Sequence, residues 1–419
     1  MRPQDTSLDR PSPDLTTQLI HHPYRPPEDF AAPQPGVFKA STVFFPSVAA
    51  MRSREWKHKT GYTYGLHGTP TSYLLEERLA TLEGGLQTLL VPSGLSAIAL
   101  VGLSLLAQGD EVLLPDNVYG PSKALAEGEL KTWGITHQFY DPMDPQDLAR
   151  RITDRTRVVW LEAAGSVTLE FPDLPELLRI CRASPQVTVA LDNTWGAGLA
   201  FNAFDIAPGL GVDLTAHALT KYPSGGGDVL MGSVVTRDEA LHLRLKNTHM
   251  RLGLGVGMND VEAVLRGLPS IVLRYAAHDR AARRLAHWCL DRTEFSQVLH
   301  PALPDAPGHA HWKTLCGGAA DAAGSGPGLP GQAAGLFSVM FDARYTGVQV
   351  DAFCDALQLF KLGYSWGGPV SLVVPYDLNA MRERWPAHLK PGTLVRFSVG
   401  LEAVEDLQAD LAQALGRLS

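Results

Sequence analysis

A chain of 419 residues, 45% of them hydrophobic, can bury a large core in two domains, or in one domain with an appendage. Its formal net charge is −8, and no dense run of lysine and arginine predicts binding to nucleic acid. The four cysteines form no C-x-x-C pair, so we expect no metal site and reduced thiols in a cytoplasmic protein.

The N-terminal segment is polar and contains prolines, without the apolar region of a secretory signal. The most apolar stretch, from Leu95 to Ala107, is too short to span a membrane and includes serines. We therefore expect a core helix at this stretch and no membrane partner.

Residues 71 to 235 alternate between helical and strand periodicity. Because strands that alternate with helices form right-handed βαβ crossovers, the pattern predicts an α/β domain with a mainly parallel sheet. In such sheets, ligand-binding groups lie at the carboxyl ends of the strands. Helices are expected at 71–85, 94–110, 121–133 and 174–184, and strands at 87–91, 111–115, 135–140, 157–162, 187–192 and 229–235.

The character of the chain changes after residue 257. A long helical pattern at 260–291 contains one proline and could join two domains, and a smaller α+β domain is expected after it. Residues 317–335 are rich in glycine, alanine and proline, which predicts a flexible surface loop. The expected organisation is an N-terminal arm at 1–68, a large α/β domain at 69–267 and a C-terminal α+β domain at 268–419.

Lys221 lies between an apolar stretch, which reads as a buried strand end, and a run of three glycines. Burial removes water from an ammonium group and lowers its pKa, which makes the amine nucleophilic. The segment taken alone fits a structural lysine in a salt bridge equally well.

Two other loops extend this pattern. "VPSGLSA", residues 91–97, runs from a strand through Ser93 and Gly94 into a helix, whose N-terminus could bind an anion. The strand at 187–192 ends in Asp192, which is costly to bury without a partner. An anion cradle, an aspartate and a lysine at strand ends suggest pyridoxal phosphate, holding its phosphate, ring nitrogen and aldehyde respectively. Each feature has an ordinary structural explanation, but their order makes the combination informative.

Six motifs occur in order: "YGLHGTPT", "LEGG", "DNTWGAG", "TKYPSGGGDVLMG", "GYSWGG" and "RFSVGLE". With them the sequence resembles the Cys/Met-metabolism enzymes and, within that family, the cystathionine β-lyases most closely. The resemblance implies the fold of fold-type I PLP-dependent transferases (aspartate aminotransferase-like), with a mainly parallel sheet in a large domain plus a smaller α+β C-terminal domain. It also implies pyridoxal 5'-phosphate as cofactor, an amino-acid substrate, and a homo-oligomer, either a dimer or a tetramer formed by two dimers.

By this resemblance, Lys221 would form a Schiff base with the cofactor and then move the substrate α-proton. Asp192 would pair with the pyridine nitrogen, and Tyr119 would stack on the ring and assist catalysis, unless it is an ordinary core tyrosine. The phosphate would be held by four residues: Ser93, Gly94, Leu95 and Thr220.

Arg396 would bind the substrate α-carboxylate through its guanidinium fork, unless it is a surface arginine on a strand. Tyr364, Ser365 and Trp366 of "GYSWGG" would line the same region. Tyr64 would belong to the site of a neighbouring subunit and take part in its catalysis and cofactor binding. His67 would lie near substrate or phosphate, or else be only a turn residue.

The sequence departs from the family pattern near the expected phosphate. Leu66 stands where relatives usually carry an arginine that reaches a neighbouring subunit's phosphate. Arg52 or Arg54 could replace that arginine, or the helix N-terminus could suffice with His67 nearby. Serine is common where Ala218 stands.

A second departure concerns the far end of the substrate. Some β-lyases place an acid a few residues after the stacking tyrosine, where this chain has Lys123 and Ala124. Recognition of the distal end is therefore open.

The predicted activity is PLP-dependent β-elimination of L-cystathionine to homocysteine, pyruvate and ammonia, a step of transsulfuration toward methionine. Other cysteine conjugates or cystine could serve as substrates. The alternatives are a γ-lyase, a γ-synthase or an O-acetylhomoserine sulfhydrylase of the same family, and a PLP-binding regulator without turnover. Retention of Arg396 argues against the regulator, which has no substrate carboxylate to bind.

Overall fold

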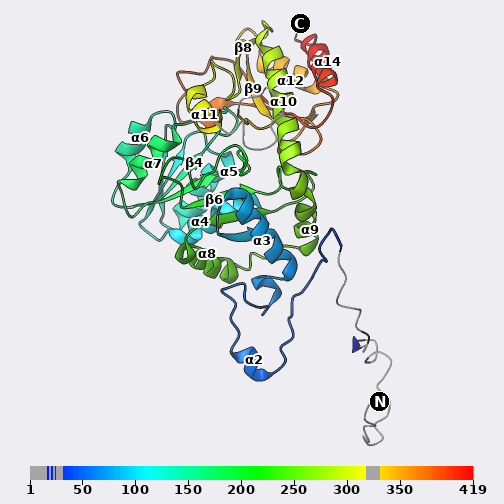
Figure 1. Cartoon of the computed structure of the whole chain (residues 1–419). Coiled ribbons are helices and arrows are strands. Elements are labelled where there is room, and N and C mark those ends of the chain that lie inside the picture. The colour runs from blue at the N-terminus through cyan, green and yellow to red at the C-terminus, as the bar shows by residue number, and fades with distance from the viewer. Residues whose placement is uncertain (1–16, 18–19, 22–23, 25–31, 318–330, 419) are drawn as a thin grey trace, which may run out of the picture. The chain divides into compact units, whose positions relative to one another are not determined.

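The computed structural model describes residues 17, 20, 21, 24, 32–317 and 331–418, and the chain divides into two compact units, 1–36 and 37–419. All elements named below belong to the second unit, which is drawn with the whole chain in Figure 1. The predicted loop at 317–335 lies mostly outside the described residues.

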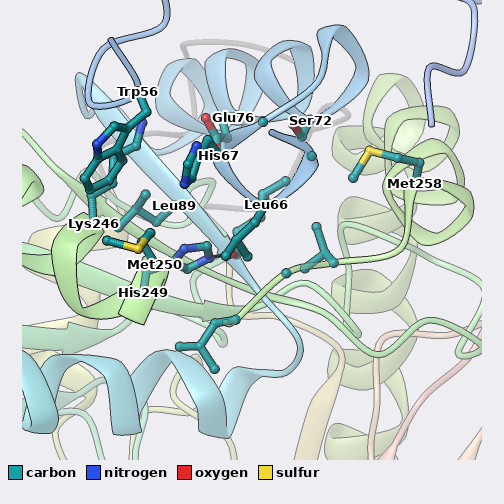
Figure 2. A pocket seen from close by; sticks show the side chains of 16 residues that line it. Trp56, Leu66, His67, Ser72, Glu76, Leu89, Lys246, His249, Met250 and Met258 are labelled. Atoms are coloured by element: carbon teal, nitrogen blue, oxygen red, sulfur yellow. Dashed lines mark hydrogen bonds between the residues drawn. The ribbon is translucent and has the colours of Figure 1, made fainter. Parts of the chain in front are cut away.

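The second unit begins with an arm that contains one short helix, α2 (Val48–Arg52), and a 3-10 turn (Gly65–His67). The arm leads into α3 (Pro70–Glu83), which starts at a capping box of Thr69 and Ser72 and ends at Gly84 in the left-handed conformation. Figure 2 shows side chains of this turn among side chains of α3 and of α8 (Glu239–Leu252).

Within the described residues, seven strands form one sheet in the order β1-β7-β6-β5-β4-β2-β3. The pairs from β3 to β6 are parallel, and β7 is antiparallel to both of its neighbours. The predicted mainly parallel sheet is therefore confirmed. Its strands are β1 (Gln87–Val91), β2 (Glu111–Pro115), β3 (Thr136–Tyr140), β4 (Thr156–Glu162), β5 (Thr188–Asp192), β6 (Leu214–Ala218) and β7 (Gly232–Thr236).

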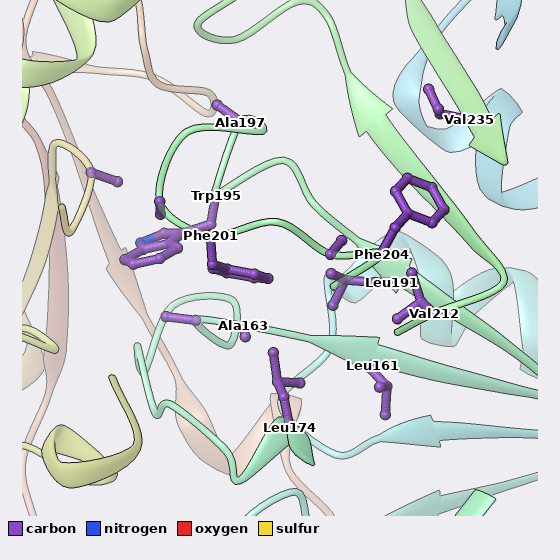
Figure 3. Packing of buried hydrophobic residues seen from close by; sticks show 14 of the residues in the cluster. Leu161, Ala163, Leu174, Leu191, Trp195, Ala197, Phe201, Phe204, Val212 and Val235 are labelled. Carbon is purple, nitrogen blue, oxygen red and sulfur yellow. The ribbon is translucent and has the colours of Figure 1, made fainter. Parts of the chain in front are cut away.

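Both faces of this sheet are buried, because successive strand residues are apolar on both sides. Val159 and Leu161 of β4 pack in a cluster with α3, α7 (Leu174–Arg182) and α9 (Met258–Gly267), part of which Figure 3 shows. Val158 and Trp160 pack on the opposite face with α4 (Gly94–Leu105) and α8. The predicted core helix at Leu95 to Ala107 corresponds to α4.

Two further helical segments border the large sheet. A π-helical turn (Ala126–Leu130) follows α5 (Gly120–Leu125), so the predicted helix at 121–133 is not a single α-helix. The remaining helix of this part is α6 (Pro145–Arg151), which begins at the N-cap Asp144.

The helix predicted at 260–291 is interrupted. It consists of α9, a 3-10 turn (Leu268–Ser270) and α10 (Ile271–Leu290), because Pro269 lacks the amide that a continuous α-helix requires. In Figure 1, α10 extends from α9 to the second sheet.

A smaller sheet follows α10, with strand order β10-β11-β12-β9-β8 and antiparallel pairing except between β10 and β11. The predicted fold class is thus confirmed, while the domain boundaries at 68 and 267 stay predictions. The strands are β8 (Phe295–Leu299), β9 (Leu336–Phe341), β10 (Lys361–Leu362), β11 (Leu372–Tyr376) and β12 (Leu394–Ser398). The helices are α11 (His309–Cys316), α12 (Gly347–Ala356), α13 (Leu378–Met381) and α14 (Val404–Leu415).

The cysteines are free and buried, as expected. Of the helices that the structure describes, none is long and apolar enough to cross a bilayer.

Candidate active site

Two carboxylates lie at the carboxyl edge of the large sheet. Glu162 ends β4 and pairs in register with Asp192, which ends β5. Burial raises the pKa of Asp192, and burial together with the charge of Asp192 raises the pKa of Glu162 well above its ordinary value. A cationic group brought to this edge would therefore stabilise the ionised form of these acids.

Lys221 follows β6 and reaches the same edge. Its Nζ donates a hydrogen bond to Ser365 Oγ at 2.7 Å and lies 5.2 Å from the ring centroid of Trp366. Burial, followed by the charge of Arg396, lowers the pKa of Lys221 to about 8, although Asp192 acts in the opposite direction. No carboxylate in the described part of the chain lies within 4.0 Å of Nζ, so a salt bridge does not explain this lysine.

Ser365 has an unusual backbone. Its φ of +122° lies in a region that residues other than glycine rarely adopt. The residue nevertheless keeps its hydroxyl 2.7 Å from Lys221 Nζ. Strained conformations cluster at functional sites, which is consistent with a role for this hydroxyl in orienting the amine.

The N-terminus of α4 lies beside the end of β6. Ser93 is the N-cap and its Oγ accepts a hydrogen bond from Ser96 N at 3.1 Å. A Cβ placed on Gly94 would come within 2.6 Å of Ala218 Cβ, so the two elements approach closely only because Gly94 has no side chain. Amides of a first helical turn lack helix partners and favour an anion. Thr220 also lies here, with its Oγ1 3.3 Å from Met231 O.

Arg396 lies on β12, and only 7% of its surface is exposed. Its guanidinium carbon is 5.3 Å from the ring centroid of Tyr376, and burial lowers its pKa. Among the described residues, its buried Nε has no hydrogen-bond partner. A buried cation with an unpartnered donor is suited to bind an anion, and a carboxylate offers a matching pair of acceptors.

Tyr119 completes the group. Its backbone N donates to Glu162 Oε2 at 2.9 Å, and 41% of the residue is exposed. Burial, Asp192 and Glu162 raise the pKa of Tyr119, whereas Arg396 lowers it. Tyr119 thus contacts a carboxylate of the large sheet and is close enough to Arg396 of the small sheet to be affected by its charge.

The predicted site residues fall into two groups. Contacts and charge interactions connect Lys221 with Asp192, Ser365, Trp366 and Arg396. Also at this edge or beside it are Ser93, Gly94, Leu95, Tyr119, Thr220 and Tyr364, of which Leu95 is 36% and Tyr364 is 82% exposed. The roles assigned to all of these residues stay predictions.

Tyr64 and His67 form the second group, in the arm. The His67 ring stacks on Trp56 with centroids 5.0 Å apart, and its Nδ1 is 2.8 Å from Thr63 Oγ1. Ser41 Oγ donates to the Tyr64 hydroxyl at 3.3 Å. Within the described part of one chain, neither residue forms a hydrogen bond or ring contact with Lys221. The predicted roles of both residues stay predictions.

Leu66 and His67 line a pocket of about 30 Å³ (Figure 2). Lys246 of α8 also lines it, is 5% exposed, and forms no ion pair with the acids that the structure describes. Arg52 and Arg54 are exposed on the arm. Lys246 thus lines the same pocket as Leu66, which stands at the position of the missing arginine.

Sequence reasoning missed two residues of the site. Glu162 ends an apolar strand in the same way as Asp192, so the signal that identified Asp192 also applies to it. Tyr376 carries no comparable signal, because its contact with Arg396 arises only from the register of β11 and β12.

The family described as "Cys/Met metabolism PLP-dependent enzyme" matches residues 16–416. The chain belongs to this family of enzymes, which depend on pyridoxal phosphate. The recognised family, the enzyme class and the cofactor are thereby confirmed.

The chain is similar over nearly its full length to proteins named for different reactions. A cystathionine beta-lyase of Bordetella avium is 37% identical over 409 residues, covering 96% of this chain and 97% of the relative. A cystathionine beta-lyase of Salmonella typhimurium is 32% identical over 385 residues, covering 91% and 92%. The crystal structure of cystathionine gamma synthase from Xanthomonas oryzae pv. oryzae in complex with cystathionine is similar with a TM-score of 0.80 and 28% identity, covering 94% and 95%.

Proposed function

We propose that this enzyme is a cystathionine β-lyase, which converts L-cystathionine and water to homocysteine, pyruvate and ammonia in the cytoplasm. The observation that carries the proposal is a low-pKa amine, Lys221, beside a buried arginine, Arg396, whose Nε lacks a partner. The names of the β-lyase relatives support the same reaction.

The residues present fit pyridoxal 5'-phosphate. Lys221 offers an amine for its aldehyde, Asp192 an acid for its ring nitrogen, and the N-terminus of α4 with Ser93 a cradle for its phosphate. When bound, this cofactor supplies an electron sink that stabilises negative charge at the substrate α-carbon.

Lys221 is suited to proton transfer near neutral pH. A pKa of about 8 leaves an appreciable neutral fraction of the amine, which accepts the proton from the substrate α-carbon. The hydrogen bond to Ser365 Oγ at 2.7 Å and the nearby Trp366 ring fix the direction of Nζ.

Arg396 orients the substrate. Its guanidinium binds the α-carboxylate, and Tyr376 supports the guanidinium from the side. Because Arg396 is buried and Lys221 is partly buried, water is limited around these charges and their interactions are strengthened.

β-Elimination needs one proton removed from the α-carbon and a thiolate that leaves from the β-carbon. A γ-elimination or γ-replacement needs a second proton removed, at the β-carbon. Cystine and other cysteine conjugates also have an α-proton and a sulfur leaving group on the β-carbon, so they are expected as further substrates. The similarity to a γ-synthase keeps the γ-reactions as the alternative. A regulator without turnover is disfavoured by the carboxylate-binding position of Arg396.

The assembly is proposed to be a homo-oligomer, because Tyr64 has no place in the Lys221 site of its own chain. The buried, free cysteines support a reducing compartment.

Steady-state assays with cystathionine, cystine, methionine and O-acetylhomoserine test the proposal. We expect the highest kcat/KM with cystathionine and no turnover of methionine. Preferred turnover of methionine or O-acetylhomoserine would replace the β-lyase by a γ-enzyme, and absence of turnover with all four would favour the regulator.

A further inference from the structure

Five charged or titratable side chains form a network away from Lys221. Arg382 lies in the connection between β11 and β12, and its Nε is 3.1 Å from Asp116 Oδ2 and its Nη2 3.1 Å from Glu170 Oε1. His388 Nε2 is 2.7 Å from Glu170 Oε1, and Lys123 Nζ is 2.6 Å from Asp116 Oδ1. We call these five residues the loop clamp.

The loop clamp joins the two sheets through buried groups. The side chains of Arg382, Glu170 and Asp116 are 5%, 0% and 14% exposed. Burial alone would raise the pKa of Glu170, but the hydrogen bond from His388 and the charge of Arg382 lower it to about 2. Arg382 pairs with both acids, so its loss leaves Asp116 with Lys123 and Glu170 with His388 as the remaining partners, and weakens the compensation of two buried charges.

Two of the three N–H donors of the Lys123 ammonium are used inside the protein. Its Nζ donates to Asp116 Oδ1 at 2.6 Å and to Met381 O at 2.7 Å, and lies 4.6 Å from the Phe139 ring centroid. The lysine therefore connects the loop after β2 with the end of α13.

Both loops that the clamp connects carry residues of the candidate site. Asp116 and Lys123 lie three residues before and four residues after Tyr119. Arg382 lies in the connection that has Tyr376 at its start and leads to Arg396. The clamp thus links the loop that carries Tyr119 to the connection that leads to Arg396.

A small apolar cluster, in which Val167 packs with Leu378 and Leu389, lies beside the clamp where these loops meet. A pocket of about 330 Å³ lies there, lined by Val118 and Gly120 on one loop and Ala380 and Arg382 on the other. On the side of this pocket that Arg382 and Lys123 line, the ion pairs and hydrogen bonds of the clamp connect the two loops.

We propose that Arg382 and Lys123 are positioning residues, which hold Arg396 at the spacing from Tyr119 and Lys221 that a substrate α-carboxylate requires. The inference rests on the proposed role of Arg396 in carboxylate binding. It predicts that a damaged clamp weakens recognition of the carboxylate and leaves the cofactor site intact.

The test compares binding of L-alanine and ethylamine to the holoenzyme, followed by cofactor absorbance. The two ligands differ only in the carboxylate, and L-alanine carries no leaving group, so binding is measured without turnover. Arg382→Met should reduce the preference for L-alanine by about tenfold or more, since small misplacements of a binding group are costly. Arg382→Lys should recover part of it, and Arg384→Met, at an exposed arginine nearby, should leave it unchanged.

A folded Arg382→Met protein with the wild-type preference would overturn the inference, as would equal weakening of both ligands. If Arg382→Met does not fold, Lys123→Met takes its place, and an unchanged preference in that variant has the same meaning. The measurement does not depend on which sulfur amino acid is turned over. The preference for L-alanine over ethylamine can therefore be interpreted even if the enzyme is not a β-lyase.

Discussion

The lowered pKa of Lys221 leads to a quantitative prediction about its reactivity. Burial and Arg396 lower this pKa from 10.5 to about 8. At pH 7 about 10% of such an amine is neutral, against about 0.03% of an ordinary lysine, a difference of roughly 300-fold. In the cofactor-free protein, Lys221 should therefore react with a trace of acetic anhydride along a pH curve whose midpoint lies near 8.

Peptide mass spectrometry gives the extent of labelling at each pH, with the exposed Lys131 as the reference for the activity of the reagent. Arg396→Met should move the midpoint of Lys221 upward, because the charge of Arg396 contributes to lowering its pKa. A midpoint near the ordinary lysine value in the wild-type protein would refute the reasoning. A midpoint that does not respond to Arg396→Met would show that burial acts alone.

Three further predictions concern the candidate site, and a fourth concerns the loop clamp. Arg396→Ala should lower kcat/KM for cystathionine by two or more orders of magnitude, because an unpaired carboxylate costs about 2 to 5 kcal/mol. Arg396→Lys should recover part of the loss, and near-wild-type kinetics of Arg396→Ala would make this arginine structural. Mixing inactive Lys221→Ala with inactive Tyr64→Phe should restore activity through hybrid sites, and a mixture that stays inactive after verified subunit exchange would reject a shared site. Leu66→Arg should slow loss of cofactor in dialysis, by about tenfold or more, through one charge-assisted contact; unchanged retention would place the phosphate out of reach. Glu170 of the loop clamp has a pKa of about 2 in the fold, so it contributes about 3 kcal/mol of stability that is present above pH 4.5 and lost as pH falls toward 2. In urea unfolding, Glu170→Gln should reduce the dependence of the unfolding free energy on pH between 4.5 and 2, and a dependence equal to that of wild type would contradict the account.

The strand ends of the large sheet could be predicted because their signals are local. Apolar runs of five to seven residues identify the strands, and a charged residue at the end of such a run identifies Asp192. The predicted strand boundaries were less accurate where apolar residues continue beyond the end of a strand. The strand expected at 229–235 begins at Gly232, because Met231 pairs with Thr220 in the preceding loop.

The loop clamp could not be predicted, because its partners lie far apart in the chain. Lys123 and Met381 are separated by 258 positions, and Arg382 and Glu170 by 212. No periodicity links residues at such distances, and each of these charges alone is typical of a solvated surface. The same holds for Lys246, whose burial beside Leu66 results from the packing of α8 against the arm.

The keto acid formed from L-cystathionine tests the central claim most directly. β-Elimination yields pyruvate together with homocysteine, whereas γ-elimination yields 2-oxobutanoate together with cysteine. Purified holoenzyme should produce pyruvate and homocysteine in equal amounts, and Lys221→Ala should produce neither. Formation of 2-oxobutanoate and cysteine by the wild-type enzyme would contradict the proposed β-lyase reaction.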